Sequence, residues 1–163
     1  MDAREYVQEV ELNLRTISDL QEAQQIILDN VERRLDVSDW AGYLGNAATV
    51  VGLITAFSKH SVWGLATGLV GLFTSVLPNE KERLRVHLQN GINYLGTLQR
   101  YLIQNQEYDA LKAKLPFLEY RNVDGTTRFV IGEGYITGVR NRGGGWNTDH
   151  ANPCFLYLAT FSG

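Results

Sequence analysis

The first third of the chain has apolar residues at alternating spacings of three and four positions. Residues so spaced lie on the same face of an α-helix, so the pattern is the heptad spacing of an amphipathic helix. It predicts one long helix over residues 3–36, with glutamines at two central positions of the apolar stripe. The stripe consists of Val7, Val10, Leu14, Ile17, Gln21, Gln24, Leu28, Val31 and Leu35.

Residues 40–78 form an apolar stretch that contains one formal charge, Lys59, beside His60. This polar pair separates two arms, Trp40 to Phe57 and Ser61 to Leu77, and predicts a hydrophobic helical hairpin. At about 1.5 Å per residue each arm is roughly 25 Å long, near the lower limit for crossing a bilayer core of about 30 Å. Such a hairpin is unfavourable in water, so we expect it to be buried, covered by a partner or placed in a membrane.

Small residues recur every four positions in both arms, at Ala48 and Gly52 and again at Gly64 and Gly68. This glycine-zipper spacing lets two helix backbones approach closely. It serves either membrane insertion or tight packing inside a soluble bundle. The residues predicted to insert are Ala48, Gly52, Leu53, Phe57, Lys59, His60, Trp63, Gly64, Gly68, Leu69 and Phe73.

A second heptad stripe follows the hairpin and predicts another long helix, from the N-cap Asn79 to about Lys114. Pro116 marks its end. The stripe consists of Leu84, Leu88, Gly91, Leu95, Leu98 and Leu102. Together with the first helix and the hairpin, this gives an antiparallel helical bundle over residues 1–115.

Residues 116–163 have the composition of strands and turns, and Asp124-Gly125 is a tight-turn signal between two apolar runs. They predict a small antiparallel β meander, so the expected fold class is α+β. A glycine-rich loop in this part carries Arg140, Arg142 and Trp146. Those three residues are a candidate surface for a ligand or partner, while a simple connecting loop is the alternative.

The net charge of −3 gives no indication of nucleic-acid binding. A single cysteine excludes a framework of intrachain disulfides. The first residues are polar and acidic, without the apolar core of a signal peptide. We therefore expect a soluble cytoplasmic protein, with release or membrane association as a later event.

Residues with catalytic chemistry form no recognisable motif. Asp149, His150 and Cys154 are close in sequence, but catalytic Cys–His pairs arise from spatial, not sequential, proximity. Neither the three histidines nor the glycines near residue 134 have the spacing of a metal or phosphate site. The prediction is a non-enzyme without a cofactor or metal.

The order of long helix, apolar hairpin and long helix over residues 3–114 resembles the α-helical pore-forming toxins of the haemolysin BL and cytolysin A type. In that family the apolar tongue, which corresponds to residues 46–77, is hidden in the soluble form and inserts during oligomerisation. The resemblance implies a membrane-active, lytic protein whose hairpin inserts conditionally.

Two functional hypotheses follow. In the first, the protein is toxin-like and pore-forming, and its partner is a lipid membrane. In the second, it is a non-enzymatic structural or oligomerisation module, of bacterial or prophage type, with the hairpin as permanent core and a second copy or a helical partner. The first hypothesis predicts dye leakage from liposomes, and the second predicts none.

Overall fold

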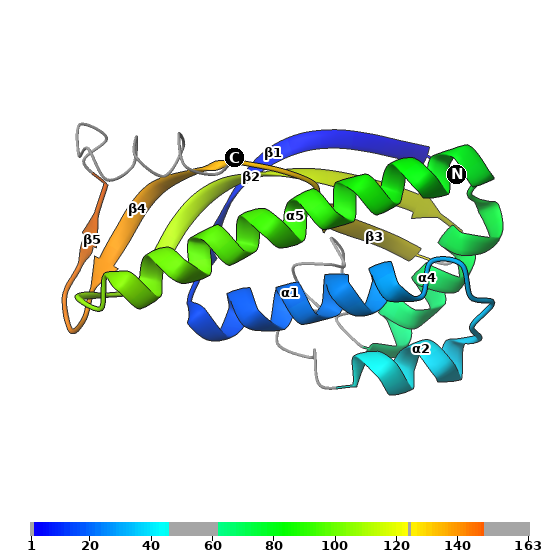
Figure 1. The fold of residues 1–163 in the computed structure, drawn as a ribbon, viewed down its shortest axis with the longest axis horizontal. Helices are drawn as coiled ribbons and strands as arrows, with labels where there is room; N and C mark the ends of the chain where they lie inside the picture. Colours follow the sequence, from blue (N-terminus) through cyan, green and yellow to red (C-terminus); the bar gives the residue numbers. More distant parts are fainter. Residues whose placement is uncertain (1, 46–61, 124, 149–163) are drawn as a thin grey trace.

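The computed structural model describes residues 2–45, 62–123 and 125–148. The protein is α+β, but the predicted bundle with a small C-terminal meander is wrong, because a large antiparallel sheet replaces much of the expected helix (Figure 1). The elements are β1 (Asp2–Leu12), α1 (Leu14–Asp29), α2 (Val37–Leu44), α4 (Val62–Ser75), α5 (Pro78–Gln104), β2 (Tyr108–Asn122), β3 (Gly125–Val130), β4 (Tyr135–Asn141) and β5 (Trp146–Asn147).

The sheet is organised around β2, the longest strand. On one edge β2 pairs with β1 along the whole length of β1, from Asp2 opposite Arg121 to Leu12 opposite Leu111. On the other edge it pairs first with β4 and then with β3, so these two short strands share one edge. The hairpin of β2 and β3 was predicted correctly, but it belongs to a sheet that also contains the N-terminal strand.

The predicted helix over residues 3–36 divides into a strand and a shorter helix. In β1, Tyr6, Val10 and Leu12 alternate with glutamates, and the structure uses this period of two in place of the heptad spacing. Asn13 then begins α1 with a capping box: its side chain accepts a hydrogen bond from the Thr16 amide, and the Thr16 hydroxyl accepts one from the Asn13 amide.

The second predicted helix ends ten residues early. In α5 the whole predicted apolar stripe is buried, but the chain leaves the helix at Asn105 and enters β2. From Leu111 to Leu115, buried apolar residues alternate with two lysines, which is the pattern of a strand with one solvent-exposed face. Tyr101 at the end of α5 stacks on Tyr108 at the start of β2.

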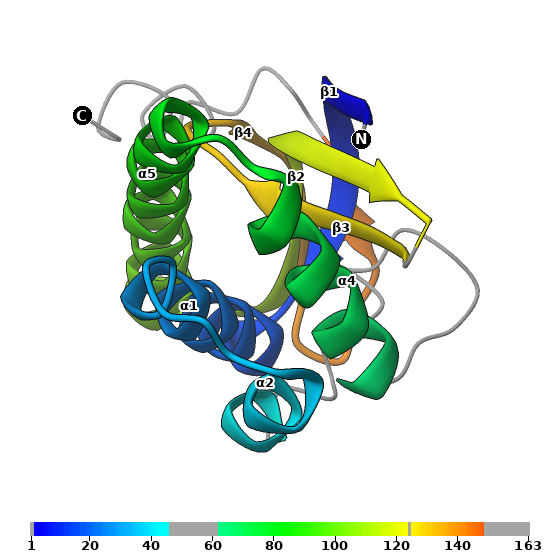
Figure 2. The same ribbon diagram turned by 90° about the vertical axis from the view of Figure 1, so that its right-hand side faces the viewer.

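The helices lie beside the sheet in a second layer. Helices α1 and α5 run side by side, α4 crosses β3, and α2 packs on α4 away from the sheet (Figure 2). The ring of Trp40 on α2 stacks on Phe73 of α4 with the centroids 5.7 Å apart. All of these elements contribute to one hydrophobic core.

The register of β1 and β2 separates a buried face from a solvated one. Gln8, Val10 and Leu12 lie opposite Leu115, Ala113 and Leu111, and the β2 members of these pairs are fully buried. On the other face Glu9 lies opposite Lys114 and Glu11 opposite Lys112. Beyond Pro116 both faces of β2 are covered, because every residue from Phe117 to Tyr120 is buried.

The second arm of the predicted hairpin forms α4 and belongs to the core, where Leu65, Leu69 and Leu72 are fully buried. Gly68 faces the strand β3, since a Cβ at Gly68 would lie 2.9 Å from the Thr127 hydroxyl. Within the described residues no helix is both long enough and apolar enough to cross a membrane. Because α4 packs on β3 as part of the core, we correct the prediction that the second arm is a membrane-inserting segment or one side of a helix-on-helix glycine zipper. Ala48 and Gly52 of the first arm lie outside the described residues.

Candidate functional site

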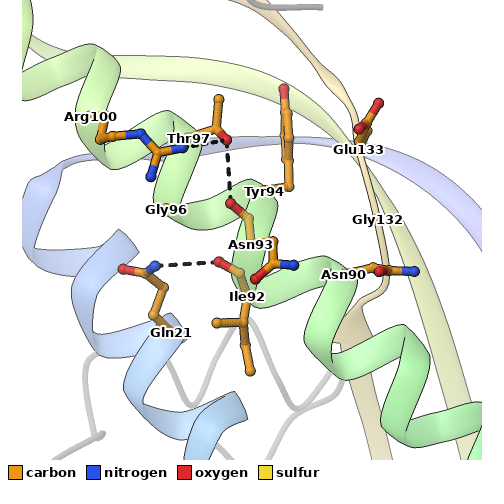
Figure 3. A pocket seen from close by; sticks show the side chains of 10 residues that line it. All are labelled: Gln21, Asn90, Ile92, Asn93, Tyr94, Gly96, Thr97, Arg100, Gly132 and Glu133. Carbon is orange, nitrogen blue, oxygen red and sulfur yellow. Dashed lines mark hydrogen bonds between the residues drawn. The ribbon is translucent and has the colours of Figure 1, made fainter. Parts of the chain in front are cut away.

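A polar groove runs along the exposed side of α5 and has a volume of about 690 Å³ (Figure 3). Its walls come from three segments that are far apart in the sequence: α1, α5 and the connection between β3 and β4. Most of the side chains that line it are polar. The lining residues are Gln21, Asn90, Ile92, Asn93, Tyr94, Gly96, Thr97, Arg100, Gly132 and Glu133.

A glycine and a glutamine connect α1 to α5 at the groove. Gln21 donates a hydrogen bond from Nε2 to the carbonyl oxygen of Ile92 over 3.4 Å. A Cβ at Gly96 would lie 3.2 Å from the same Nε2, so the missing side chain leaves room for the glutamine. The Gln21 amide therefore packs closely against α5 beside Gly96.

The polar side chains along α5 are held by hydrogen bonds within the helix. Gln89 donates from Nε2 to Oδ1 of Asn93 over 2.9 Å, and Arg100 donates from Nη2 to the Thr97 hydroxyl over 3.2 Å. Both contacts join residues three or four positions apart, which face each other on a helix. Asn93 and Thr97 are therefore oriented before any ligand arrives.

Tyr94 lines the groove and is almost fully buried, with 1% of its surface exposed. Within the part of the chain that the structure describes, its hydroxyl has no hydrogen-bond partner. Burial raises the pKa of Tyr94, the negative charge of Glu133 raises it further, and the nearby Gly134 amide counters the shift only in part. The phenol is therefore a neutral polar group at the wall of the groove.

The groove can bind a polar ligand but shows no catalytic arrangement. Each carboxamide of Gln21, Asn90 and Asn93 offers both a donor and an acceptor. The charged side chains of the lining are Arg100 and Glu133, so the formal charge of the lining is zero. Among the described residues no group of three histidine, cysteine, aspartate or glutamate side chains could hold a metal ion.

The candidate loop residues lie at the other end of the sheet. Arg140 is on β4 and Trp146 on β5, and the guanidinium carbon lies 5.5 Å from the centroid of the indole ring. Lys112 of β2 approaches the same ring to 4.5 Å. Arg142 lies in the turn between the strands and donates from Nε to the carbonyl oxygen of Gln106. The structure thus brings two of the three residues together, on the solvated face of the sheet.

Of the residues predicted to insert into a membrane, the structure describes those on α4. Ala48, Gly52, Leu53, Phe57, Lys59 and His60 lie outside the described residues. Gly64, Gly68, Leu69 and Phe73 are at least half-buried on α4, while Trp63 is exposed. None of these five described residues lines the groove.

Reasoning from the sequence did not find the groove. Four of the α5 residues that line it occupy positions 90, 93, 97 and 100, which are polar positions between the apolar residues of the heptad stripe. The sequence signal that could have indicated the groove is this polar stripe of small and amide side chains next to Gly96. The other walls could not be inferred, because they depend on where α1 and the β3–β4 connection pack.

Comparisons with known proteins give no relative: no protein-family model, no curated protein and no solved structure matches the chain. The resemblance to helical pore-forming toxins is therefore corrected. It depended on two long helices that frame a hairpin, and the structure replaces residues 2–12 and 108–115 of those helices with paired strands.

Proposed function

We propose that the protein is a non-enzymatic binding module that holds a small, neutral, hydroxyl-rich ligand, such as a sugar or polyol, in the groove along α5. The observation that carries the proposal is that three carboxamides and the Thr97 hydroxyl line one groove of about 690 Å³. This volume is within the range of about 300–1,000 Å³ that is typical of small-molecule sites.

The chemistry of the lining favours a neutral ligand. Amide side chains can donate to and accept from a sugar hydroxyl at the same time. The opposite charges of Arg100 and Glu133 cancel, so the groove offers no net attraction to an ion. In this proposal the second arm of the hairpin, α4, has the role of permanent core.

The test is an NMR titration of the ¹⁵N-labelled protein with glucose and with glycerol. We expect saturable shifts of the side-chain amide signals of Gln21, Asn90 and Asn93. The variant Asn93→Leu removes the central amide at similar volume and should weaken binding about tenfold, which corresponds to the loss of one or two hydrogen bonds.

The control is Gln25→Leu, which removes an exposed amide of α1 that bonds only to Asp29 among the contacts described. It should leave the titration unchanged. If neither glucose nor glycerol shifts the groove amides in a saturable way, or if both variants bind equally, the proposal is wrong.

A further inference from the structure

A second pocket lies where the connection between α1 and α2 meets α2, α4 and the first turn of α5. Its volume is about 490 Å³, which is within the range of about 300–1,000 Å³ that is typical of small-molecule sites. It shares no lining residue with the groove along α5. Its lining combines apolar side chains with charged ones, so it offers a different chemistry from the groove.

The apolar part of the lining belongs to the edge of the hydrophobic core. Trp40 and Val76 are buried members of the core, and three half-buried side chains pack against it. The apolar lining residues are Leu35, Trp40, Val70, Phe73 and Val76. An apolar group placed against them is removed from water, which is favourable in proportion to the area that it buries.

The charged part of the lining is mostly positive. Its charged residues are Glu32, Arg33, Arg34 and Lys81, so the formal charge of the lining is +2. The carboxylate of Glu32 already accepts a hydrogen bond over 2.6 Å from Arg85, which lies outside the lining. Lys81 acts on the same carboxylate through its charge, without a direct contact.

The acidic residues nearest along the chain do not line the pocket. Asp36 and Asp39 each accept a hydrogen bond from the backbone amide of the other at the start of α2. Glu82 lies 3.6 Å from Arg85, so it faces a cation that is also outside the lining. The lining therefore keeps its excess of positive charge.

The three cations of the lining differ in what they already bind. Arg33 donates from Nη1 to Oδ1 of Asn30 over 3.0 Å, and its guanidinium carbon lies 5.9 Å from the centroid of the Tyr43 ring. Within the part of the chain that the structure describes, the side chains of Arg34 and Lys81 make no hydrogen bond and no ion pair. Arg34 and Lys81 are therefore the groups that can bind an anion.

Charged donors beside an apolar surface suit a ligand with one anionic end and one apolar end. A guanidinium and an ammonium both donate charge-assisted hydrogen bonds to a carboxylate, and these are about twice as strong as hydrogen bonds between neutral groups. A neutral apolar molecule would leave the cations unused, and a small anion would leave the apolar lining in water.

We propose that this pocket binds a small amphipathic carboxylate, such as a medium-chain fatty acid. The carboxylate group binds Arg34 and Lys81, and the hydrocarbon chain packs against Trp40 and Phe73. The site is independent of the groove along α5, so either site can fail its test without consequence for the other.

The test is an NMR titration of the ¹⁵N-labelled protein with octanoate at neutral pH. We expect saturable shifts of the Trp40 indole signal and of the backbone amides of Val70 and Phe73. Two further titrations divide the ligand into its parts: 1-octanol keeps the chain without the charge, and acetate keeps the charge without the chain. Each should bind at least about tenfold more weakly than octanoate.

Variants of the two cations test the anionic end of the ligand. Arg34→Gln and Lys81→Gln should each weaken octanoate binding about five- to tenfold and leave 1-octanol binding unchanged. The matched control is Arg15→Gln, which removes an exposed charge of α1 outside the pocket and should bind octanoate like the wild type.

A pair of neighbouring substitutions tests the location. Thr74 and Ser75 are both exposed in the last turn of α4, and the hydroxyl of each donates to a carbonyl of the same helix. Thr74 lines the pocket and Ser75 does not. Thr74→Asp should therefore weaken octanoate binding about tenfold by repulsion, while Ser75→Asp should leave it close to that of the wild type.

Three results would overturn the proposal. The first is the absence of saturable shifts with octanoate in the wild type. The second is equal affinity for octanoate and 1-octanol, which would show apolar adsorption without recognition of the carboxylate. The third is an equal loss of octanoate affinity in Thr74→Asp and Ser75→Asp, or in Lys81→Gln and Arg15→Gln, which would show a general effect of charge.

Discussion

The side chain of Gln24 on α1 makes both backbone hydrogen bonds of Val130, the last residue of β3. Its Oε1 accepts from the Val130 amide over 2.8 Å, and its Nε2 donates to the Val130 carbonyl over 3.1 Å. Both residues are fully buried. The Gln24 side chain thus satisfies the backbone N–H and C=O groups at the end of β3. These two hydrogen bonds also hold α1 against the sheet.

The variant Gln24→Leu tests this relationship. It keeps a similar volume but leaves two buried backbone groups of Val130 without partners, each of which costs about 1–3 kcal/mol. We expect a loss of about 2–4 kcal/mol in the free energy of unfolding, measured by urea denaturation. The exposed neighbour Gln25→Leu should change it by less than about 0.5 kcal/mol. Equal effects would show that the Gln24 pairing contributes nothing.

The close contact between Gly91 of α5 and the backbone of Val130 predicts a second effect on stability. A Cβ on Gly91 would overlap the carbonyl oxygen and carbon of Val130, which are backbone atoms and cannot turn aside. Gly91→Ala should therefore destabilise the protein by about 3 kcal/mol or more, at the upper end of the range for overpacking. The measurement is the midpoint of thermal unfolding.

The matched control for Gly91 is the exposed helical Gly42, where an added Cβ would have no atom within 4 Å. Gly42→Ala should stabilise α2 by up to about 1 kcal/mol, because alanine has the higher helix propensity. If Gly91→Ala also stabilises the protein, then α5 is not in contact with Val130 as described.

The same two residues show what the sequence reveals and what it does not. Gln24 and Gly91 both stand out as unusual members of the apolar stripes. The first stripe forms a helix over part of its length, and the second forms one over its whole length. The stripe marks the buried face of a helix, but it does not say what covers that face. A buried amide and a glycine that face a strand edge look the same in the sequence as residues of a helix–helix contact.

Strand β1 and the first part of β2, residues 108–115, were missed for a different reason. Over residues 111–115 leucine and alanine alternate with lysine, and over residues 9–12 apolar residues alternate with glutamate. These short patterns fit a strand, but they lie next to helical patterns. The first heptad stripe covered residues 9–12, and the second predicted helix was extended past its stripe to Lys114. The pairing that decides between them joins residues about a hundred positions apart, which local patterns do not contain. The groove depends on the same packing, and the contacts of Arg4 and Arg121 with Glu119 depend on the same pairings.

Acid should weaken the contribution of Glu119 to stability. Burial alone would raise its pKa, but the hydrogen bonds from Arg4 and Tyr6 and the charges of Arg4 and Arg121 outweigh burial and lower the pKa below the ordinary value of 4.5. A lowered folded-state pKa gives stability that is present above the unfolded-state value and is lost as the pH falls through the folded-state value. The loss therefore belongs to the range below pH 4.5.

The measurement compares wild type with Glu119→Gln by urea denaturation at about pH 7 and about pH 3. We expect the wild type to be more stable at neutral pH and the difference to shrink in acid. The exposed Glu22→Gln should show no such convergence. A gap between wild type and Glu119→Gln that stays constant with pH would argue against an ionised Glu119 beside Arg4 and Arg121.

Removing the Tyr94 hydroxyl should stabilise the protein. The hydroxyl is buried and has no hydrogen-bond partner among the described residues, so folding removes its hydrogen bonds to water and these residues do not replace them. Tyr94→Phe should raise the free energy of unfolding by about 1 kcal/mol. The partly exposed Tyr43→Phe, whose hydroxyl accepts from Arg33, should stay within about 0.5 kcal/mol of wild type. Destabilisation in Tyr94→Phe would mean that this hydroxyl is hydrogen-bonded in solution.

Alkaline pH should destabilise the protein through the buried phenol of Tyr120. Burial raises the pKa of Tyr120 to about 12, the charge of Glu80 adds to the shift, and that of Arg83 opposes it. The unfolded chain ionises its tyrosines near 10, so between the two values the unfolded state releases a proton that the folded state retains. The free energy of unfolding should therefore fall as the pH rises from 10 to 12.

Tyr120→Phe isolates this effect, because it removes the titrating hydroxyl and keeps the ring that packs edge-on against Phe129. Its free energy of unfolding should fall less steeply with pH over this range than that of the wild type, and its phenolate absorbance should lack one late-titrating group. Wild-type and variant stability curves that run parallel up to pH 12 would mean that Tyr120 already ionises in the folded state as freely as in the unfolded chain.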